Sequence, residues 1–264
     1  MSKLQILCAT MHQNDFSKIK EMNIRCDVVF ANQADRMEKQ VMEFDGHQAQ
    51  MITTDTRGVG VNRNIAMLHA DGDVLLFADD DLIYDDHCEA RVLQAFEEHP
   101  DADVIVFELD FTKEGQVYFQ RRHKAGKLSI VEALKYGTCF MAVRRVSITR
   151  ANIWFHTEFG GGCRYSSGED SLFLRDCFRK KLKIYKYKYC LGQCRKDDSS
   201  WFEGYTEKYF TDKGVWLSCA FPVSGGLLVP LLAYKWRKQN PEFGIWKIAR
   251  LMQSGFRKGK KGLK

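Results

Sequence analysis

The sequence predicts an α/β fold with a mostly parallel central sheet flanked by helices, followed by a C-terminal helical tail. Short apolar runs alternate with segments of helical spacing, which is the pattern of strands buried on both faces of a parallel sheet. The 264 residues are 45% hydrophobic and 28% charged, which is the composition of a globular chain long enough for a sizeable core. A change in composition near residue 205 separates a main domain, 1–205, from the tail, 206–264.

In the first half, five apolar runs are expected to form strands: residues 4–10, 26–31, 50–53, 74–78 and 103–108. Residues 62–69 and 85–98, which lie between these runs, have helical spacing. In open sheets of this kind, ligands bind beyond the carboxyl ends of the strands. We therefore expect Thr10, Asn32 and the acidic run after Ala78 to lie at the binding edge.

The second half is less regular, and its turn and capping residues carry most of the signal. Glu114 and Gly115 predict a hairpin turn before a strand at 117–121. Ser129 and Glu132 have the spacing of a capping box that opens a short helix. Beyond them we expect a strand at 138–144, a helix at 171–181, a strand at 183–189 and a loop at 192–204.

Positive charge is concentrated in the tail. Residues 235–264 hold ten Lys and Arg and one acid, which leaves a charge of −3 on the other 234 residues. The body needs no basic face to explain the total, so a nucleic-acid partner is not expected. Nine cysteines without a CxxC pair, behind an N-terminus that lacks the order of a signal peptide, predict reduced and mostly buried thiols in a cytoplasmic protein.

Asp79, Asp80 and Asp81 follow a buried strand directly. Alternate residues of an extended chain point to the same side, so Asp79 and Asp81 can face one site. Two close carboxylates raise each other's pKa unless a cation lies between them, and a hard divalent cation such as Mg²⁺ or Mn²⁺ suits such ligands. The alternative is a solvated acidic turn that caps the next helix.

Two pairs of motifs resemble those of family 2 glycosyltransferases. The first pair is RGVGVNRN at 57–64 followed by GDVLLFADDD at 72–81, and the second is FG at 159–160 followed by GEDSLF at 168–173. Their order and the roughly ninety residues between the two acidic motifs also match. The resemblance covers residues 4–205 and implies the GT-A nucleotide-sugar-binding fold, an inverting mechanism and a nucleoside-diphosphate sugar as donor, with UDP the expected nucleotide.

The resemblance also implies roles for individual residues. Asp79 and Asp81 would bind the divalent cation, Mn²⁺ or Mg²⁺, and Asp81 would be the more direct ligand. Asp170 would be the general base, and Glu169, Trp201 and Gly161 would contact the acceptor or the donor sugar. The residues expected to bind the donor are Thr10, Asn32, Asp35, Arg63, Asp79 and Asp80.

Simple physical arguments support the base but leave another explanation open. A positioned carboxylate contributes about 10²–10⁴-fold as a general base to a weak hydroxyl nucleophile. Acids at a helix N-terminus are also favoured by the helix dipole, so Glu169 and Asp170 could have a purely structural role. The family usually has a carboxylate directly after the second strand, where this chain has Asn32, so either Asn32 or Asp35 is expected to contact the nucleotide base.

The tail combines an uncharged segment with a basic one. Residues 215–234 carry no charge, but Pro222, Pro230 and two glycines argue against a regular spanning helix. We leave two alternatives open for this segment, membrane docking and packing on the main domain. Residues 243–256 have the pattern of an interfacial helix attracted to anionic lipid, which predicts a peripheral protein at the inner face of the cell membrane.

Together these features predict transfer of a sugar to a saccharide or a lipid-linked acceptor, and by analogy with the family we expect a role in polysaccharide or glycolipid assembly. A nucleotidyltransferase that makes nucleotide sugars would share the sheet and the paired acids. However, it would need a glycine-rich basic loop after the first strand, where this chain has ATMHQND. The other alternative is a non-catalytic, membrane-tethered carbohydrate-binding module.

Overall fold

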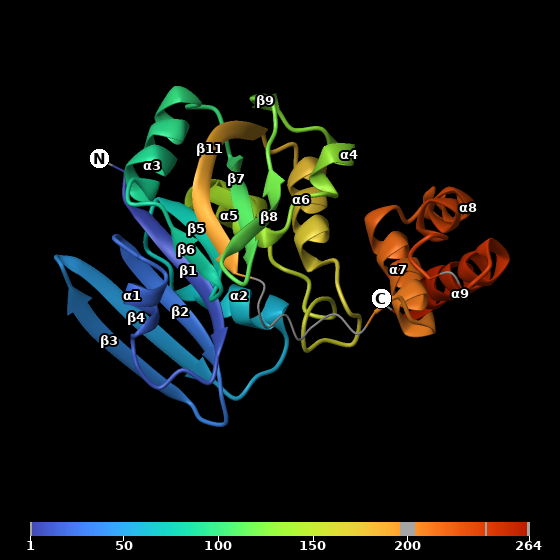
Figure 1. The fold of residues 1–264 in the computed structure, drawn as a ribbon, viewed down its shortest axis with the longest axis horizontal. Coiled ribbons are helices and arrows are strands. Elements are labelled where there is room, and N and C mark those ends of the chain that lie inside the picture. Colours follow the sequence, from blue (N-terminus) through green and yellow to red (C-terminus); the bar gives the residue numbers. More distant parts are fainter. Residues whose placement is uncertain (1, 196–203, 241, 263–264) are drawn as a thin grey trace.

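The computed structural model describes residues 2–195, 204–240 and 242–262. Their strands form one mixed sheet in the order β3-β4-β2-β1-β5-β10-β7-β11-β6, with β8 paired to β7 and β9 to β11 (Figure 1). The strands are β1 (Leu4–Met11), β2 (Asp27–Gln33), β3 (Glu38–Phe44), β4 (His47–Thr54), β5 (Val74–Asp79), β6 (Leu82–Tyr84), β7 (Val104–Lys113), β8 (Gln116–Arg121), β9 (Gly126–Lys127), β10 (Met141–Arg144) and β11 (Ile184–Arg195).

Helices lie against the sheet, and three more form a separate layer at the C-terminal end (Figure 1). The helices are α1 (Lys18–Glu21), α2 (Val59–His69), α3 (Cys88–Glu98), α4 (Ile130–Ala133), the 3-10 turn η1 (Thr138–Phe140), α5 (Arg145–Ala151), α6 (Glu169–Arg179), α7 (Glu207–Ala220), α8 (Gly225–Trp236) and α9 (Ile245–Gly262). The α/β class is thus confirmed, and so is the capping box of Ser129 and Glu132.

The prediction of a mostly parallel sheet needs correction, because the sheet is mixed. β4, β2, β1 and β5 are mutually parallel. In contrast, β10 runs antiparallel between β5 and β7, while β3 and β6 pair antiparallel with β4 and β11. An apolar run reports that a strand is buried but not its direction, and the exposed strand β3 has little apolar signal at all.

Strand β11 is longer than its apolar run. The predicted loop at 192–204 is wrong in its first part, because β11 continues to Arg195. Gly192 pairs with Tyr84 of β6. A side chain at position 192 would collide with the carbonyl oxygen of Ile83. This pairing holds the turn between β5 and β6, and hence the acidic run, against the end of β11.

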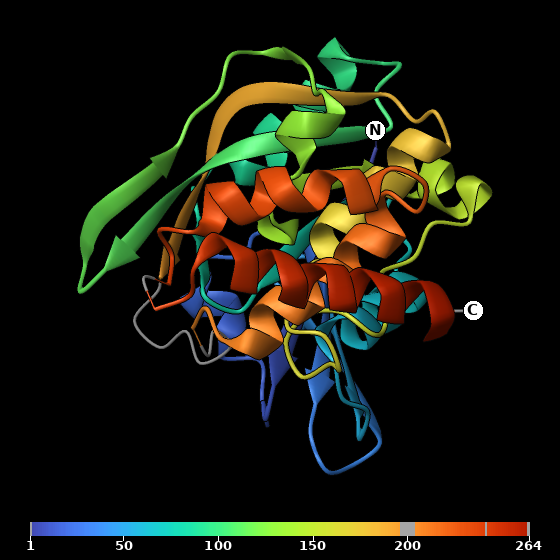
Figure 2. The same cartoon turned by 90° about the vertical axis from the view of Figure 1, so that its right-hand side faces the viewer.

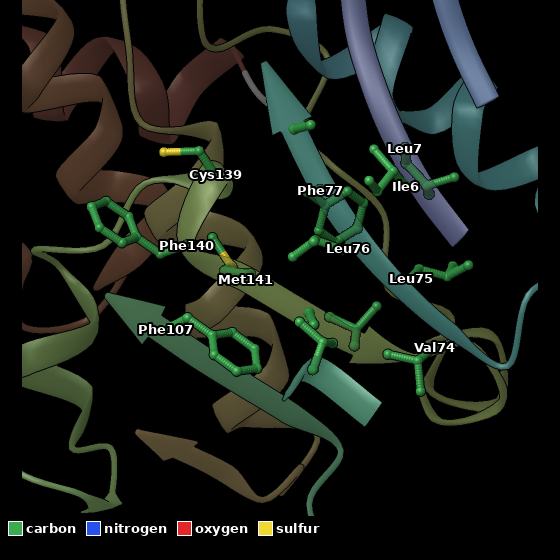
Figure 3. Packing of buried hydrophobic residues seen from close by; sticks show 14 of the residues in the cluster. Ile6, Leu7, Val74, Leu75, Leu76, Phe77, Phe107, Cys139, Phe140 and Met141 are labelled. Atoms are coloured by element: carbon green, nitrogen blue, oxygen red, sulfur yellow. The ribbon is translucent and has the colours of Figure 1, made fainter. Parts of the chain in front are cut away.

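Apolar residues on both faces of the sheet form the core (Figure 3). Phe77 of β5 makes edge-to-face contacts with Phe155 and Phe173, at centroid distances of 5.1 and 5.6 Å, and these two rings stack on each other at 4.3 Å. Phe173 belongs to α6, so the stack fixes α6 against β5. The nine cysteines are free thiols and six of them are buried, which confirms the prediction that they are mostly buried.

The C-terminal helices share a second apolar cluster with the main domain. Phe210, Val215 and Leu217 of α7 are fully buried in it, together with Phe159 and Leu172 of the main domain. Of the two alternatives left open for residues 215–234, packing on the main domain therefore applies to the first part of the segment. Among the residues that the structure describes, none of the helices is both long and apolar enough to cross a membrane.

Helices α7 and α9 approach each other at glycines. A Cβ atom on Gly255 would lie 1.9 Å from the carbonyl oxygen of Thr211, and one on Gly214 would lie 2.0 Å from that of Met252. Such distances leave no space for a methyl group. The two backbones are consequently in direct contact, and this close packing sets the position of α9.

We predict that Gly255→Ala lowers the free energy of unfolding by about 1–3 kcal/mol, because the added methyl group forces the two helices apart. Urea denaturation measures this difference. The matched control is Gly262→Ala in the same helix, where a Cβ meets nothing within 4 Å. The control should keep or slightly raise the stability, since Ala is the better helix former. Equal stability of Gly255→Ala and wild type would contradict the close packing.

Candidate active site

The site begins where α2 meets the ends of two strands. Asn62, buried in α2, donates hydrogen bonds from Nδ2 to the carbonyl oxygens of Thr10 (3.2 Å) and Ala31 (2.8 Å). These carbonyls lie at the carboxyl ends of β1 and β2. The first turns of α2 are thereby held at the edge of the sheet where parallel strands present ligand-binding groups.

The acidic run lies at this same edge. Asp79 ends β5, and Asp80 and Asp81 form the turn to β6. Thr10 donates a hydrogen bond from Oγ1 to Asp80 Oδ2 at 2.5 Å, and the backbone N–H of Arg195 donates to the carbonyl of Asp81 at 2.8 Å. The run is therefore tied to β1 on one side and β11 on the other, which argues against a simple solvated turn.

Arg63 joins the two acidic motifs. Its guanidinium contacts Asp79 Oδ1 through Nη2 at 2.6 Å and Glu169 Oε1 through Nη1 at 2.8 Å. The side chain is 6% exposed and lies over the ring of Phe155. Although burial disfavours the charge, the two carboxylates raise the pKa of Arg63, so the guanidinium stays ionised. Arg63 thus holds together Asp79 and Glu169, of which Glu169 is 106 positions away from Arg63 in the sequence.

Gly168, Glu169 and Asp170 form the start of α6. Gly168 has φ +127°, a conformation that L residues rarely adopt, and a Cβ there would lie 2.4 Å from Trp216 of α7. Its backbone N–H donates to Glu169 Oε2, and Trp216 Nε1 donates to Ser171 Oγ at 3.0 Å. Glycine at position 168 therefore allows both the unusual backbone angle and the direct contact with α7.

Asp170 is the carboxylate whose titration the site perturbs most clearly. Burial, followed by the negative charge of Glu169, raises the pKa of Asp170 to about 6. A hydrogen bond from the N–H of Ser171 and the charges of Arg63 and Lys213 act in the opposite direction. A carboxylate with this pKa is mostly ionised at neutral pH and is a better proton acceptor than an ordinary aspartate.

Lys213 is a member of the site to which no sequence motif points. It lies in α7, its Nζ donates to Ser167 Oγ at 3.0 Å, and burial lowers its pKa. The negative charges of Asp170, Glu169 and Asp212 act in the opposite direction on that pKa. A basic residue within an amphipathic helix normally signals a solvated position, so this role is visible only after folding.

The glycine loop before α6 is anchored to α2. The N–H of Val59 donates to the carbonyl oxygen of Gly161 at 2.9 Å, and a Cβ on Gly160 would lie 2.5 Å from the side chain of Val59. The predicted acceptor residue Gly161 consequently lies beside the first turn of α2. The same loop approaches Glu169, because a Cβ on Gly160 would also lie 2.8 Å from Glu169 Oε2.

The two candidates for contacting a nucleotide base differ in exposure. Asn32 is fully buried, and its amide bonds the backbone N–H and C=O of Gln13 and the hydroxyl of Thr53. Asp35 is 86% exposed and pairs with Arg57 at 2.5 Å. Asp35 is thus the accessible member of the pair, while Asn32 positions the loop after β1. The remaining predicted residue, Trp201, lies outside the described residues.

The acidic edge suits a hard cation that is bound together with a phosphate group. Carboxylate oxygens from Asp79, Asp80 and Asp81 are ligands of the type that Mg²⁺ and Mn²⁺ prefer. Within the described part of the chain, no group of three or more His, Cys, Asp or Glu side chains gathers as a metal site. Mg²⁺ commonly takes one or two carboxylates and completes its coordination shell with water and phosphate oxygens.

Comparisons with known proteins bear on the family and on the fold. A family model described as Glycosyl transferase family 2 matches residues 12–153, which include Arg63 and the acidic run. A search of curated proteins gave no significant match.

Solved structures of TarS from S. aureus have a similar fold. TarS 1–349 in complex with UDP-GlcNAc is 12% identical, with a TM-score of 0.63 over 99% of this chain and 91% of that one. The same fragment in complex with UDP is 14% identical, with a TM-score of 0.63 over 97% and 92%. A longer TarS structure is 14% identical, with a TM-score of 0.61 over 96% and 55%. At these identities the likeness shows a common fold, and it extends through α6 and the C-terminal helices.

We predict that Arg63→Met lowers the free energy of unfolding by about 3–5 kcal/mol, because it leaves Asp79 and Glu169 without their shared cation. Urea denaturation at neutral pH measures the loss. The matched control is Arg57→Met, which breaks an exposed pair with Asp35 and should cost no more than about 1 kcal/mol. Similar losses in both variants would show that Arg63 is not the central link.

We also predict that Asp170 titrates with a pKa of about 6 and that Lys213→Met raises this pKa further. Removal of a nearby positive charge disfavours the carboxylate, so protonation then begins at higher pH. Carboxyl carbon chemical shifts, followed by NMR during a pH titration, report the value. Lys208→Met in the same helix is the control and should leave it unchanged. A wild-type pKa near 4, or no change in Lys213→Met, would contradict the arrangement.

Proposed function

The chain belongs to glycosyl transferase family 2, and from this premise we propose that it is an inverting glycosyltransferase of the GT-A type. It would move a sugar from a nucleoside-diphosphate sugar to a hydroxyl group of a saccharide or lipid-linked acceptor. The observation that carries the proposal is the Arg63 bridge, which holds the acidic run and the Gly168–Asp170 motif at one edge of the sheet. UDP is the favoured nucleotide, because TarS has been solved with UDP and UDP-GlcNAc.

On the donor side, we assign the nucleotide to the ends of β1 and β2. Thr10 and Asp80 are hydrogen-bonded to each other there and would border the ribose. Asp35 and Arg57 are exposed at the rim, within reach of the base. Arg63 would act indirectly, because its guanidinium is already paired with Asp79 and Glu169. It would orient Asp79 toward the diphosphate.

A divalent cation held by Asp79 and Asp81 would neutralise the charge that develops on the leaving diphosphate. The acidic character of this edge supports the assignment. Asp79, Asp80, Asp81 and Glu169 bring negative charge together, and among the described residues Arg63 is the cation seen to pair with two of them. The binding of a negatively charged diphosphate here therefore needs additional positive charge.

On the acceptor side, Asp170 would accept the proton of the attacking hydroxyl group. The acceptor oxygen forms a bond to the anomeric carbon as the bond from that carbon to the diphosphate oxygen breaks. The leaving oxygen retains the electron pair of that bond, and the proton ends on Asp170. A pKa of about 6 matches this task, because the carboxylate is ionised at neutral pH yet basic enough to share the proton in the transition state.

The position of Asp170 supports the choice of this residue over Glu169. Glu169 is already engaged by Arg63 and by the N–H of Gly168. Asp170, in contrast, lies opposite Gly137, and its Oδ2 atom is 3.6 Å from the point where a Cβ on Gly137 would be. Because Gly137 has no side chain, this point next to the carboxylate is not filled by one. We propose that this space next to the carboxylate receives the acceptor hydroxyl, while Glu169 and Gly161 border the sugar.

Two alternative functions, a nucleotidyltransferase and a non-catalytic binding module, can be distinguished from this proposal. A nucleotidyltransferase finds no support in the family match, and the loop after β1 is held by Asn32 rather than built from glycine and basic residues. A non-catalytic binding module would share the donor site, so it differs from an enzyme in turnover alone. The decisive experiment must therefore measure donor binding and sugar transfer in the same variants.

We predict that UDP together with Mn²⁺ raises the Tm by about 5–10 °C at 100 times its Kd, equivalent to about 2.7 kcal/mol of added stability. Asp81→Asn should abolish the metal-dependent part of this shift. Asp170→Asn should keep the shift but reduce release of UDP from UDP-GlcNAc by about 10²–10⁴-fold. The measurements are thermal unfolding and a coupled assay for UDP.

Asp176→Asn, on the opposite end of the same helix from the site, is the control and should resemble wild type in both assays. If UDP, GDP, CDP, TDP and ADP all leave the Tm unchanged, with and without Mn²⁺, the donor site is wrongly assigned. If Asp170→Asn releases UDP as fast as wild type, the general-base role is wrong. Binding without turnover in the wild-type protein, with acceptors of every class tested, would favour the non-catalytic module.

A further inference from the structure

Three apolar residues of α9 do not face outward as the sequence pattern indicates. Ile248, Met252 and Phe256 are buried, and they pack in the cluster that α9 shares with α7. The prediction of an interfacial helix with these residues in lipid is therefore corrected. What remains on the outside of α9 is Trp246, which is 83% exposed, and a row of basic side chains.

Helix α8 supplies the apolar surface that α9 lacks. Leu227, Leu231 and Tyr234 are 83%, 64% and 55% exposed and are spaced four and three residues apart, so they lie on one side of the helix. Val223, just before the helix, is 95% exposed. Large apolar side chains exposed in a continuous row usually mark an interaction surface.

The exposed sides of the two helices adjoin each other. Figure 2 shows α8 and α9 side by side across the face of the molecule that is turned away from the sheet. Pro230 of α8 and Trp246 and Arg250 of α9 line one open groove between them. We call this surface, made of Leu227, Leu231, Tyr234, Trp246, Arg250 and Arg257, the outward face.

Charge identifies the partner. Residues 223–262 carry nine Lys and Arg and one acid. Arg250 and Arg257 are four and eleven residues from Trp246 and share its side of α9, while the guanidinium of Arg237 lies 3.6 Å above the exposed ring of Tyr234. An apolar row bordered by cations and exposed aromatic rings matches the boundary between lipid headgroups and acyl chains, where amphipathic helices lie in the plane of the membrane.

We propose that the outward face docks on the surface of an anionic lipid bilayer. The leucines and Trp246 enter the boundary below the headgroups, and Arg250, Arg257 and the neighbouring lysines contact the lipid phosphates. The proposal does not depend on the identity of the donor. It gives the three C-terminal helices the task of presenting the site to a membrane, and α7 connects the docking layer to the Gly168–Asp170 motif through Trp216.

The test is sedimentation of the full chain with vesicles of phosphatidylcholine alone and of phosphatidylcholine mixed with phosphatidylglycerol, at physiological salt. Wild type should bind the mixed vesicles and not the neutral ones. Leu227→Ser with Leu231→Ser should weaken the partition coefficient about tenfold or more. Arg250→Gln with Arg257→Gln should weaken it about fivefold for each charge removed.

Matched controls change exposed residues elsewhere. Leu68→Ser removes a leucine that is 69% exposed on α2, and Lys39→Gln with Arg150→Gln removes two exposed charges. Both should bind vesicles like wild type. All variants should keep the Tm and the UDP-dependent shift of wild type, so a failure of vesicle binding is distinct from a failure of the donor site.

Three outcomes would overturn the proposal. The first is no binding of wild type to the mixed vesicles. The second is unchanged binding of the double leucine variant, which would mean a purely electrostatic attraction of the basic tail. The third is a dimer in sedimentation equilibrium that the leucine variant dissociates, without vesicle binding, since the outward face would then be a contact between two copies of the chain.

Discussion

The arrangement of the site depends on one buried guanidinium. Arg63 is placed by α2, which Asn62 ties to the ends of β1 and β2, and its two arms reach the end of β5 and the start of α6. Burial of a charge is costly unless the charge is paired, and here two carboxylates provide the pairing. Burial, followed by the negative charge of Glu169, raises the pKa of Asp170, while the charge of Arg63 acts in the opposite direction.

The second constraint comes from the C-terminal helices, which are part of the site's support. Trp216 contacts Gly168 and donates to Ser171, and Lys213 adds a positive charge near Asp170. Neither residue lies in a recognisable motif. Their helix packs on α9 through glycines that bring the two backbones together. The basic residues of α9 therefore project outward because its apolar side is committed to α7.

The sequence was sufficient for the fold class, most strands and the two acidic motifs, because buried apolar runs and motif order are local signals. It did not predict β3, which is largely exposed, or the antiparallel direction of β10, since neither leaves a mark on hydrophobic periodicity. It placed Arg63 at the donor site by resemblance but did not show that Arg63 binds Glu169. Lys213 was missed for the same reason, because contacts between distant segments depend on how the chain folds.

The apolar cluster that α7 shares with the main domain has a consequence for how the molecule unfolds. Phe159, Tyr165 and Leu172 belong to the segment around the general-base candidate, and they are buried by Phe210, Val215 and Leu217 of α7. A chain ending near residue 205 would leave these side chains in water and remove Trp216 from Gly168. The division into 1–205 and 206–264 follows composition, and the shared cluster joins the two parts. We therefore expect the tail and the Gly168–Asp170 motif to lose their structure together.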